Sequence, residues 1–458
     1  MTGEYINPLC SRYASDSMKK IFSEEEKISS WRNLWTSLAV VEKAYGANVT
    51  DEQVSEMRQH INTADLKRAA EIEKETRHDV VAHIRLFAEE CPKAAPVIHL
   101  GATSCFVADN ADVIAVQRAT MLTEMRLVYL VNSLANFASE WRNTPTVGYT
   151  HLQSAQLTTV GKRASMWLQD FVMDLDEIRR QFSNTKSLPC RGPVGSSCPS
   201  DDAMEDFEND LCLEAGLPVP FDISGQTYTR KQDFSILQSL SGIAQSAAKM
   251  SNDIRFLSST GEMVEPHEKT QVGSSAMVYK CNPIRCERVG SLSRFVINNA
   301  QSAAYTAASQ FLERTLDDSA IRRITIPETF LAVDAILNLC ADIVDNLTVV
   351  VPVVEKKVED AAPFLATEKV LSICVARGGN RQEAHEVMRE ASACGPECLV
   401  KAMTEDKRLR LNPEEVSALI NDAKTNVGKC PSMVSKYVRK VKLKIAGLPS
   451  AKPSRVEV

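Results

Sequence analysis

One stretch of the sequence, GSSAMVYKCNP at residues 273–283, gathers the side chains best suited to chemistry. Ser274 and Ser275 supply hydroxyl groups and Lys280 supplies a cation, between a flexible glycine and a terminating proline. A mobile loop of this kind suits a lid that closes over an anionic substrate. An ordinary connecting loop can have the same composition, so the residues alone leave both interpretations open.

The net charge limits the partners that the chain can bind. It is −6 at pH 7, whereas proteins dedicated to nucleic acids need basic surface that displaces counterions from phosphates. We therefore expect no nucleic-acid partner. A small anionic ligand is compatible with this charge, because screening limits distant charges to a reach of about 8–10 Å and a local cluster of Arg and Lys can hold the ligand.

Cysteine usage and the opening residues bear on the compartment and on metals. The thirteen cysteines include no C-x-x-C pair, and the opening MTGEYINPLC has no charged-then-apolar leader. This pattern is typical of free thiols in a reducing compartment, so we expect a cytoplasmic protein. Cys394 and Cys398 are spaced like some ligand pairs. Since no second pair follows, no metal and no cofactor are expected, and a zinc site is the alternative.

Membrane contact is not expected either. No apolar run approaches the roughly 20 residues that span a bilayer. The basic segment KYVRKVKLK, residues 436–444, is amphipathic, and a solvated helix face is favoured over a membrane or nucleic-acid contact.

The elements that must position the reactive residues are predicted to be long helices. Apart from Gly242, five segments contain neither Pro nor Gly: 102–144, 162–188, 226–260, 291–326 and 328–351. Apolar residues recur in them three or four positions apart, as on one face of a helix. Two such series are Leu127, Leu130, Leu134 and Phe137, and Phe295, Ala300, Ala304, Ala307 and Phe311.

Helices of this length need partners. A helix of about 30–40 residues is about 45–60 Å long and cannot bury its apolar stripe alone. Such helices lie side by side in a bundle, which subunits can share. The predicted fold class is therefore all-α, with a central bundle of long helices. A homo-oligomer is favoured, and an extended monomeric bundle is the alternative.

The chain is too long for one core, since hydrophobic cores stop growing near roughly 250–300 residues. Shorter helices are expected near 65–75 and beyond Pro352. Capping boxes are expected at two helix starts, Ser23 with Glu26 and Thr50 with Gln53. We expect three helical domains, with the boundaries 1–103, 104–349 and 350–458.

The reactive loop resembles a known signature. Its sequence is similar to the G-S-S-x-M-P-x-K-x-N-P loop of the aspartase and fumarase superfamily, except that Val278 replaces the proline. The resemblance runs from about residue 10 to about residue 390 and is strongest to the animal members of the adenylosuccinate lyase branch. Segments similar to that branch are SRYAS (11–15), RHDVVAH (77–83), LGATSCFVADNAD (100–112), THLQSAQLTTVGKR (150–163), GQTYTRK (225–231) and ERTLDDSA (313–320).

The resemblance implies an activity and an assembly. Members remove fumarate from adenylosuccinate, giving AMP, and from the succinylated aminoimidazole carboxamide ribotide SAICAR, giving AICAR, without a cofactor. They are homotetramers with a twenty-helix core, and each active site draws on three subunits.

The resemblance also implies roles for individual residues. His151 is the expected general acid, Ser274 the general base and His78 a partner that contacts the substrate. Lys280 and Asn282 are expected to stabilise the charge of the carbanion. The residues expected to contact the nucleotide or the succinyl group are Arg12, Tyr13, Arg77, Asp79, Thr103, Ser104, Gln226, Arg288, Arg314, Ser319 and Arg323.

These roles agree with elementary chemistry. A serine hydroxyl is a feeble base unless nearby positive charge or N–H groups stabilise its alkoxide, and Lys280 is a candidate for that task. Histidine titrates near neutral pH and can protonate a leaving nitrogen. The substrate carries a phosphate and two carboxylates, which arginine forks bind bidentately.

Plainer interpretations stay open for single residues. His151 precedes a helical run and could cap or pack it, and His78 could form a helix-end pair with Asp79 as the N-cap. Arg314 could pair with neighbouring acids along a helix. Two departures from the family bear on the loop: Val278 replaces proline, and Cys281 stands where close relatives carry arginine. We expect altered loop closure or weaker substrate binding from them.

Two other functions compete with this one. A sibling lyase acting on argininosuccinate, fumarate or aspartate would share the fold, the loop and the histidine. The set Arg12, Tyr13, Thr103, Ser104 and Gln226 favours a purine nucleotide over these smaller substrates. A non-catalytic helical scaffold is the second rival, and the combination of His151, Ser274 and Lys280 argues against it.

Overall fold

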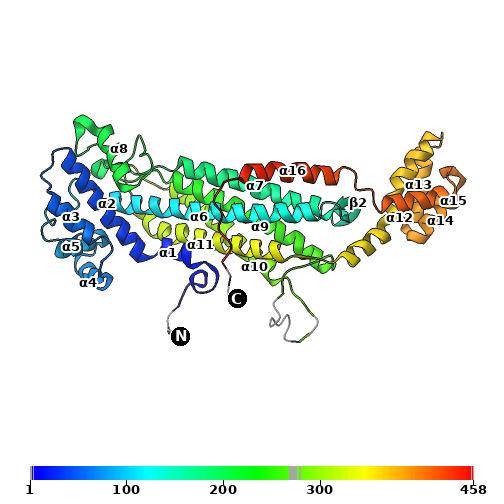
Figure 1. Ribbon diagram of the computed structural model, residues 1–458, viewed down its shortest axis with the longest axis horizontal. Helices are drawn as coiled ribbons and strands as arrows, with labels where there is room; N and C mark the ends of the chain where they lie inside the picture. The colour runs from blue at the N-terminus through cyan, green and yellow to red at the C-terminus, as the bar shows by residue number, and fades with distance from the viewer. Residues whose placement is uncertain (1–2, 4, 268–275, 278–279, 455, 457–458) are drawn as a thin grey trace.

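The molecule is elongated, and its helices form two end groups and a central bundle. The structure, a computed structural model, describes residues 3, 5–267, 276–277, 280–454 and 456. Short helices gather at both ends of the long axis, and long helices run side by side between them (Figure 1). Separate hydrophobic clusters lie in the N-terminal helices, the central bundle and the C-terminal helices.

The N-terminal end consists of several helices, most of which surround a core that contains Trp35 and Phe87, while Met18 of α1 belongs to the core of the bundle. They are α1 (Asp16–Ile21), α2 (Glu24–Ala44), α3 (Asp51–Gln59), α4 (Leu66–Thr76) and α5 (Asp79–Glu90), and α8 (Met204–Ala215) packs against α2. The capping box of Thr50 and Gln53 is confirmed. The Ser23 hydroxyl accepts from the Glu26 amide, but the Glu26 carboxylate pairs with Arg118 of another helix, so only half of that box forms.

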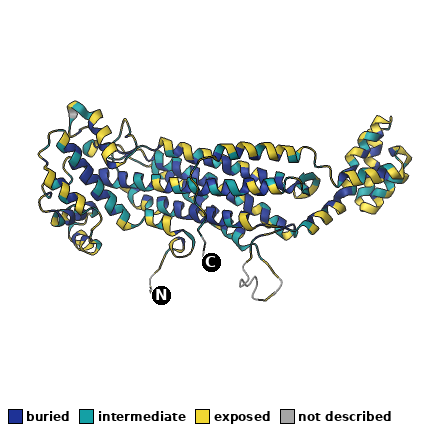
Figure 2. Cartoon of the chain, viewed as in Figure 1, coloured by how far each residue is buried: buried dark blue, intermediate teal, exposed yellow. Residues whose placement is uncertain are grey.

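Long helices make up the central bundle. They are α6 (Ser104–Glu140), α7 (Val160–Asn184), α9 (Lys231–Ser259), α10 (Ile284–Ala308), α11 (Asp317–Asn346) and α16 (Cys430–Ile445). Figure 2 shows their buried residues facing one another along the bundle. The series from Leu127 to Phe137 is buried, as its spacing predicts.

Two details of the helix prediction are wrong. Pro327 does not end a helix but lies inside α11, while the chain breaks at 309–316, where no proline stands. Because most of α11 is buried in the bundle, packing offsets the hydrogen bond that the proline removes. In α10 the predicted buried face is only partly right: Ala300 is fully buried as predicted, but Phe295 is exposed and its neighbour Val296 is buried instead.

The fold is mainly helical rather than all-α. Strands β1 (Pro145–Thr150) and β2 (Gln153–Thr159) form an antiparallel hairpin between α6 and α7. The short strands β3 (Met263–Val264) and β4 (Thr348–Val349) pair near the ends of α9 and α11. The buried Glu262 accepts hydrogen bonds from the Tyr149 hydroxyl at 2.8 Å and from Thr146 at 3.2 Å, so the base of the hairpin is anchored to the bundle.

The chain leaves the bundle and returns to it. Helices α12 (Val351–Ala376), α13 (Arg381–Ala393), α14 (Pro396–Glu405) and α15 (Pro413–Ala423) form the C-terminal end. The basic helix α16 instead packs on α6 and α7, burying Val434, Val438 and Val441. The division at residues 103 and 349 therefore stays a prediction, with α8 and α16 packing outside their assigned domains.

One helix meets the criteria for a membrane span. The window found in α11 has a mean hydropathy of 1.5, so the sequence does contain a sufficiently apolar run, contrary to our expectation. However, 83% of that window is buried inside the protein, as in the core helix of a bundle.

Candidate active site

The predicted site residues fall into three separate places within one chain. The arginine site, at the N-terminal end of the bundle, comprises Arg77, His78, Asp79, Thr103, Ser104, Gln226, Arg314, Ser319 and Arg323. The loop site comprises Arg12, Tyr13, Lys280, Asn282 and Arg288, and the hairpin tip carries His151. Ser274, Ser275 and Val278 lie outside the described residues.

In the arginine site, an ion pair joins α5 to α11. The Arg323 guanidinium donates to Asp79 Oδ2 at 2.6 Å, and the Val80 amide donates to Asp79 Oδ1 at 2.8 Å. Burial raises the pKa of Asp79, but these two hydrogen bonds, together with the charges of Arg323 and His78, outweigh it and lower the pKa overall. The N-cap of α5 is His78 rather than Asp79: His78 Nδ1 accepts from the Val81 amide at 3.4 Å.

Three segments that are distant in sequence meet at Gln226. Its side chain donates to Thr103 Oγ1 at 3.3 Å, and its backbone amide donates to the Glu313 carbonyl at 3.0 Å. Gly225 allows this approach, since a Cβ there would lie 2.6 Å from the Glu313 carbonyl oxygen. Helix α6 begins at Ser104, so its unpaired backbone N–H groups face the same region.

A chain of buried charges holds Arg314 in place. Arg314 Nη1 donates to Asp318 Oδ1 at 2.7 Å, and Asp318 Oδ2 accepts from Arg230 at 2.7 Å. Arg230 then makes a bidentate pair with Asp109 at 2.8 and 3.0 Å. Because Arg230 is only 3% exposed and Asp318 only 1%, these charges are shielded from water and act strongly on one another.

A second set of buried charges surrounds Arg322. It donates to Asp233 at 2.8 Å and to the Tyr228 hydroxyl at 2.7 Å, and it pairs with Asp112 at 3.0 Å. Burial lowers the pKa of Arg322, but the neighbouring carboxylates outweigh it and keep the pKa raised. Arg230, Arg322 and their aspartates were given no role from the sequence, because the contacts that join them lie between residues far apart along the chain.

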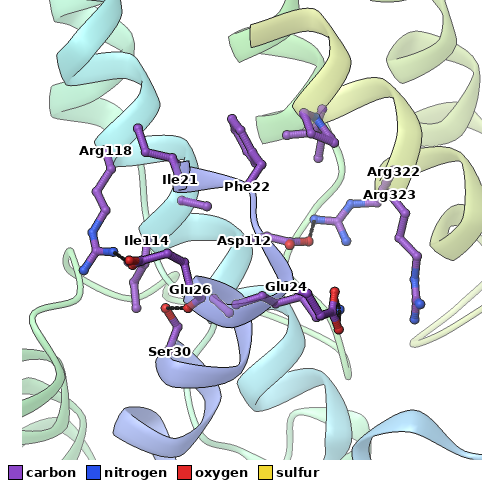
Figure 3. A pocket seen from close by; sticks show the side chains of 15 residues that line it. Ile21, Phe22, Glu24, Glu26, Ser30, Asp112, Ile114, Arg118, Arg322 and Arg323 are labelled. Atoms are coloured by element: carbon purple, nitrogen blue, oxygen red, sulfur yellow. Dashed lines mark hydrogen bonds and ion pairs between the residues drawn. The ribbon is translucent and has the colours of Figure 1, made fainter. Parts of the chain in front are cut away.

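Two adjoining cavities open at the arginine site. The larger, of about 230 Å³, lies between α2, α6 and α11, and Figure 3 shows Arg322 reaching toward Asp112 beside Arg323. The smaller, of about 80 Å³, is lined by Arg314 and Ser319. Both are bordered by Arg322 and Arg323, so a ligand here meets several guanidinium groups.

The loop site places two cations near each other. Arg12 lies in η1 (Leu9–Tyr13), one turn of π-helix, a geometry that often marks functional positions. The Arg288 guanidinium lies 5.9 Å from the Tyr13 ring centre. Burial, with a smaller contribution from Arg12, lowers the pKa of Arg288. In the described part of the chain, neither Arg12 nor Arg288 forms an ion pair with a carboxylate, so both are available to an anion.

The reactive loop enters α10 through Lys280 and Asn282. Lys280 is exposed, and its backbone amide donates to the Met277 carbonyl at 3.1 Å. Asn282 is half-buried, and its carbonyl accepts from the Ile284 amide at 2.9 Å. Both residues therefore stand just before the helix that carries Arg288.

His151 lies at the exposed tip of the β1–β2 hairpin, not directly before a helix. It forms a two-residue turn with Leu152, and both have left-handed backbone conformations, with φ of 53° and 60°. This is the region of a type I′ turn, which costs energy for residues other than Gly, Asn or Asp. Leu152 is 70% exposed and His151 is also exposed, so the tip is presented to solvent in the single chain.

Another histidine near the arginine site has a fixed tautomer. The Trp35 indole donates to His99 Nδ1 at 2.8 Å, so the ring proton of neutral His99 is on Nε2. Burial, with a smaller contribution from His78, lowers the pKa of His99 to about 4. The sequence analysis gave His99 no role. Within the described ranges, no three His, Cys, Asp or Glu side chains come together as metal ligands.

Comparisons with known proteins cover nearly the whole chain. A family model described as Lyase matches residues 7–297. An adenylosuccinate lyase of Saccharomyces cerevisiae is 41% identical, covering 95% of this chain and 94% of the relative. One of Schistosoma mansoni is 42% identical, covering 92% and 88%.

Solved structures of more distant sequences share the fold. A fumarate lyase of Mesorhizobium sp. BNC1 superposes with a TM-score of 0.83 at 22% identity, covering 96% of this chain and 99% of that one. A 3-carboxy-cis,cis-muconate lactonizing enzyme of Pseudomonas putida gives a TM-score of 0.85, also at 22% identity, covering 96% and 100%.

Proposed function

The chain belongs to the lyase family of that model and, within the aspartase and fumarase superfamily, to the adenylosuccinate lyases, and from this premise we infer how its residues act. It is a carbon–nitrogen lyase of purine biosynthesis that splits adenylosuccinate into AMP and fumarate. The observation that carries this conclusion is identity of 41–42% to adenylosuccinate lyases over more than nine-tenths of the chain. It disfavours both rivals, a sibling lyase and a non-catalytic scaffold.

We propose that Ser274 removes the proton from the carbon beside a carboxylate and that His151 protonates the departing nitrogen. The electron pair left on carbon delocalises into the carboxylate and then forms the double bond of fumarate as the C–N bond breaks. Lys280 and Asn282 stabilise the added negative charge. The exposed position of His151 supports this role, because a proton donor must reach a substrate held elsewhere.

The phosphate and two carboxylates of the substrate can bind to arginines at two places, the loop site and the arginine site. Within the described residues, Arg12 and Arg288 of the loop site form no ion pair with a carboxylate, and an anion can bind both. Arg314 and Arg323 of the arginine site are each held by one aspartate, which leaves further N–H donors for the ligand. The other members of the two sites, Tyr13, Arg77, Thr103, Ser104, Gln226 and Ser319, would surround the nucleotide and the succinyl group.

The separation of the sites supports a shared active site. Helix α6 has 37 residues and therefore rises about 55 Å from the arginine site toward the hairpin. Figure 1 shows β2 and α5 at opposite ends of the bundle. His151 of one chain cannot reach His78 of the same chain, so we propose that other copies supply the missing groups.

Exposed apolar side chains support a homotetramer with a twenty-helix core. Around the link between α10 and α11, Tyr305 is 75% exposed, Phe311 70%, Leu312 95% and Leu316 72%. Large exposed apolar patches are unusual in monomers. Side-by-side packing of α10 and α11 from several copies would cover them.

We also propose a second substrate, a cytoplasmic location and the absence of other partners or cofactors. SAICAR as a second substrate has support only from the family. A cytoplasmic location is supported by the thiols that the structure records at buried positions such as Cys286 and Cys340. Action without nucleic acid, membrane or cofactor is supported by the net charge and by a reaction that needs only proton transfer and charge stabilisation.

The proposal is tested by following fumarate and AMP release from adenylosuccinate. Wild type should be active, and Ser274→Ala and His151→Ala should each lose most of the rate. His385→Ala, which changes an exposed histidine of α13, is the matched control and should keep full rate. An inert wild type that instead splits argininosuccinate would refute the function, and full activity of either variant would refute that residue's role.

A further inference from the structure

A buried ion pair in the middle of the bundle connects the two ends of the chain. Arg126 of α6 donates through Nε to Asp334 Oδ1 of α11 at 2.7 Å. Arg126 is 4% exposed and Asp334 is 1% exposed. This pair contacts residues near both termini, and the four elements together are called the terminal clasp: Arg126, Asp334, Ser15 and the tail segment 452–454.

On the N-terminal side, the clasp holds the residue that follows η1. The Ser15 amide donates to Asp334 Oδ2 at 2.8 Å, and Arg126 Nη2 donates to Ser15 Oγ at 3.1 Å. At the other end of η1, Asn7 donates to Glu328 Oε1 at 2.6 Å. The turn that carries Arg12 and Tyr13 is therefore fixed at both ends by carboxylates of α11.

On the C-terminal side, the chain crosses the bundle after α16 and reaches the same arginine. Arg126 Nη1 donates to the Lys452 carbonyl and Nη2 to Ser454 Oγ, both at 3.1 Å. The Ser454 amide donates to Asn338 Oδ1 at 2.9 Å. Figure 1 shows both chain ends emerging on the same side of the bundle.

The tail accepts further hydrogen bonds from Arg126. A guanidinium has five N–H donors in a fixed plane, and here Asp334 and Ser15 accept only some of them. Lys452 and Ser454 accept from both terminal nitrogens and so keep the plane oriented toward Ser15. Without the tail, the guanidinium of Arg126 would be more exposed to solvent and freer to rotate, and its hydrogen bond to the Ser15 hydroxyl would be weaker.

We propose that the C-terminal tail is a positioning element for substrate binding, acting through Arg126 and Asp334 on Ser15 and thereby on Arg12 and Tyr13. The proposal rests on the proposed function only in taking Arg12 and Tyr13 as substrate contacts. None of the four clasp elements is among the residues proposed to contact the substrate. Their effect should therefore appear in KM and in the order of η1 rather than in the chemical step.

The first test truncates the full chain after Leu448, which keeps the apolar contact of that residue with the core. KM for adenylosuccinate should rise about tenfold while kcat stays within about twofold, as expected when only ground-state positioning is lost. Amide hydrogen exchange at residues 9–15 should become faster. A synthetic peptide of residues 449–458, added in excess, should lower KM again.

Point variants keep the test decisive if the truncated protein folds poorly. Ser454→Ala and Arg126→Lys should raise KM and speed exchange at 9–15 to a smaller extent. Ser450→Ala is the matched control, because Ser450 is an exposed tail serine outside the clasp. Unchanged KM and exchange in these variants, or a fall in kcat with KM unchanged, would overturn the proposal.

The exchange measurement separates this proposal from the proposed function. If Arg12→Ala leaves KM unchanged while Ser454→Ala still speeds exchange at 9–15, the assigned role of Arg12 fails and the clasp stands. If Arg12→Ala raises KM but no tail variant alters exchange or KM, the clasp fails and the function stands.

Discussion

The arginine site and the hairpin tip are built in opposite ways. In the arginine site, the half-buried Arg314 is held by Asp318, which is held by Arg230, and the last two side chains are buried. At the hairpin tip, His151 is exposed and stands on a strained turn, although Thr146 and Tyr149 anchor the strand below it to Glu262. By the proposed roles, one chain thus carries a rigid anion-binding surface and an exposed proton donor that acts on a substrate bound elsewhere.

The difference concerns what each group has to do. Cations that orient a charged substrate gain from fixed geometry, because less freedom is lost on binding. A proton donor that serves a neighbouring copy has to project from its own chain, and an exposed hairpin with a rigid base provides this. The comparison predicts that variants of the two regions fail for different reasons.

The largest effect is expected from substituting the two residues proposed to transfer protons. His151→Ala and Ser274→Ala should each reduce kcat by about 10²–10⁴-fold, the usual contribution of general acid–base catalysis. If the two residues of one site come from different chains, mixing the two inactive variants and letting subunits exchange restores activity. About a quarter of sites should then contain both intact residues. Fumarate release that stays at background after mixing would mean that one chain supplies both.

The next effect concerns the buried charges. Asp318→Asn leaves Arg230 and Arg314 without one carboxylate, and breaking a buried pair costs about 3–5 kcal/mol of unfolding free energy. Urea unfolding should show this loss together with a raised KM. Asp317→Asn changes the exposed neighbour and serves as the control. If Asp318→Asn were as stable as Asp317→Asn, the buried charges would not stabilise the arginine site, and the proposed difference between the two regions would be wrong.

A moderate effect is expected from Arg314→Lys. Lysine keeps the charge but loses the planar fork that can bind Asp318 and an anion together. KM for adenylosuccinate should rise about tenfold with kcat nearly unchanged, corresponding to about 1.4 kcal/mol. Arg389→Lys, on the exposed surface of α13, should leave KM unchanged. A loss confined to kcat would instead place Arg314 in the chemical step.

A separate effect that depends on pH arises from the buried carboxyl group of Glu42. Glu42 lies beneath the loop before Thr103, is 3% exposed, and has one oxygen without a hydrogen bond within the described protein. Burial raises the pKa of Glu42 from 4.5 to about 8. Between these values the folded state keeps a proton that the unfolded state releases, so stability falls as pH rises, by at most about 1.4 kcal/mol per pH unit.

Glu42→Gln should therefore reduce the loss of stability between pH 5 and pH 8. Urea unfolding at several pH values measures it, and the variant should gain most over wild type near pH 8. A wild-type and variant pair with parallel pH profiles would show that Glu42 does not contribute to the slope.

The smallest effect is expected in the reactive loop. Val278→Pro restores the family residue and should favour the closed loop by about 0.4–1 kcal/mol, if the local backbone accepts proline. Cys281→Arg adds a cation and should lower KM further. Steady-state kinetics of the single and double variants test this, and a higher KM in both single variants would contradict it.

The sequence predicted the elements whose signals are local. Helix α6 follows from its apolar spacing, and the cap of Thr50 and Gln53 from residues three positions apart. The family was confirmed because its motifs are short and ordered. Pro327 misled the prediction because the cost of a proline is local, whereas the packing that offsets it comes from the whole bundle.

Other features depend on residues that meet only in three dimensions. Arg230 and Asp109 are 121 positions apart, and nothing near either residue reveals the pair. The hairpin tip was also missed, because THLQ precedes an obvious helix and the strand signal of YTHLQSAQLTT is short. The assignment of His151 and Ser274 to the reaction remains a prediction from the family.

The terminal clasp also has a consequence for how the protein is made. A ribosome builds the chain from its N-terminus, so η1 and Arg126 emerge long before Ser454. The clasp can therefore close only after residues 452–454 have left the ribosome, and a shorter nascent polypeptide would lack their contacts with Arg126.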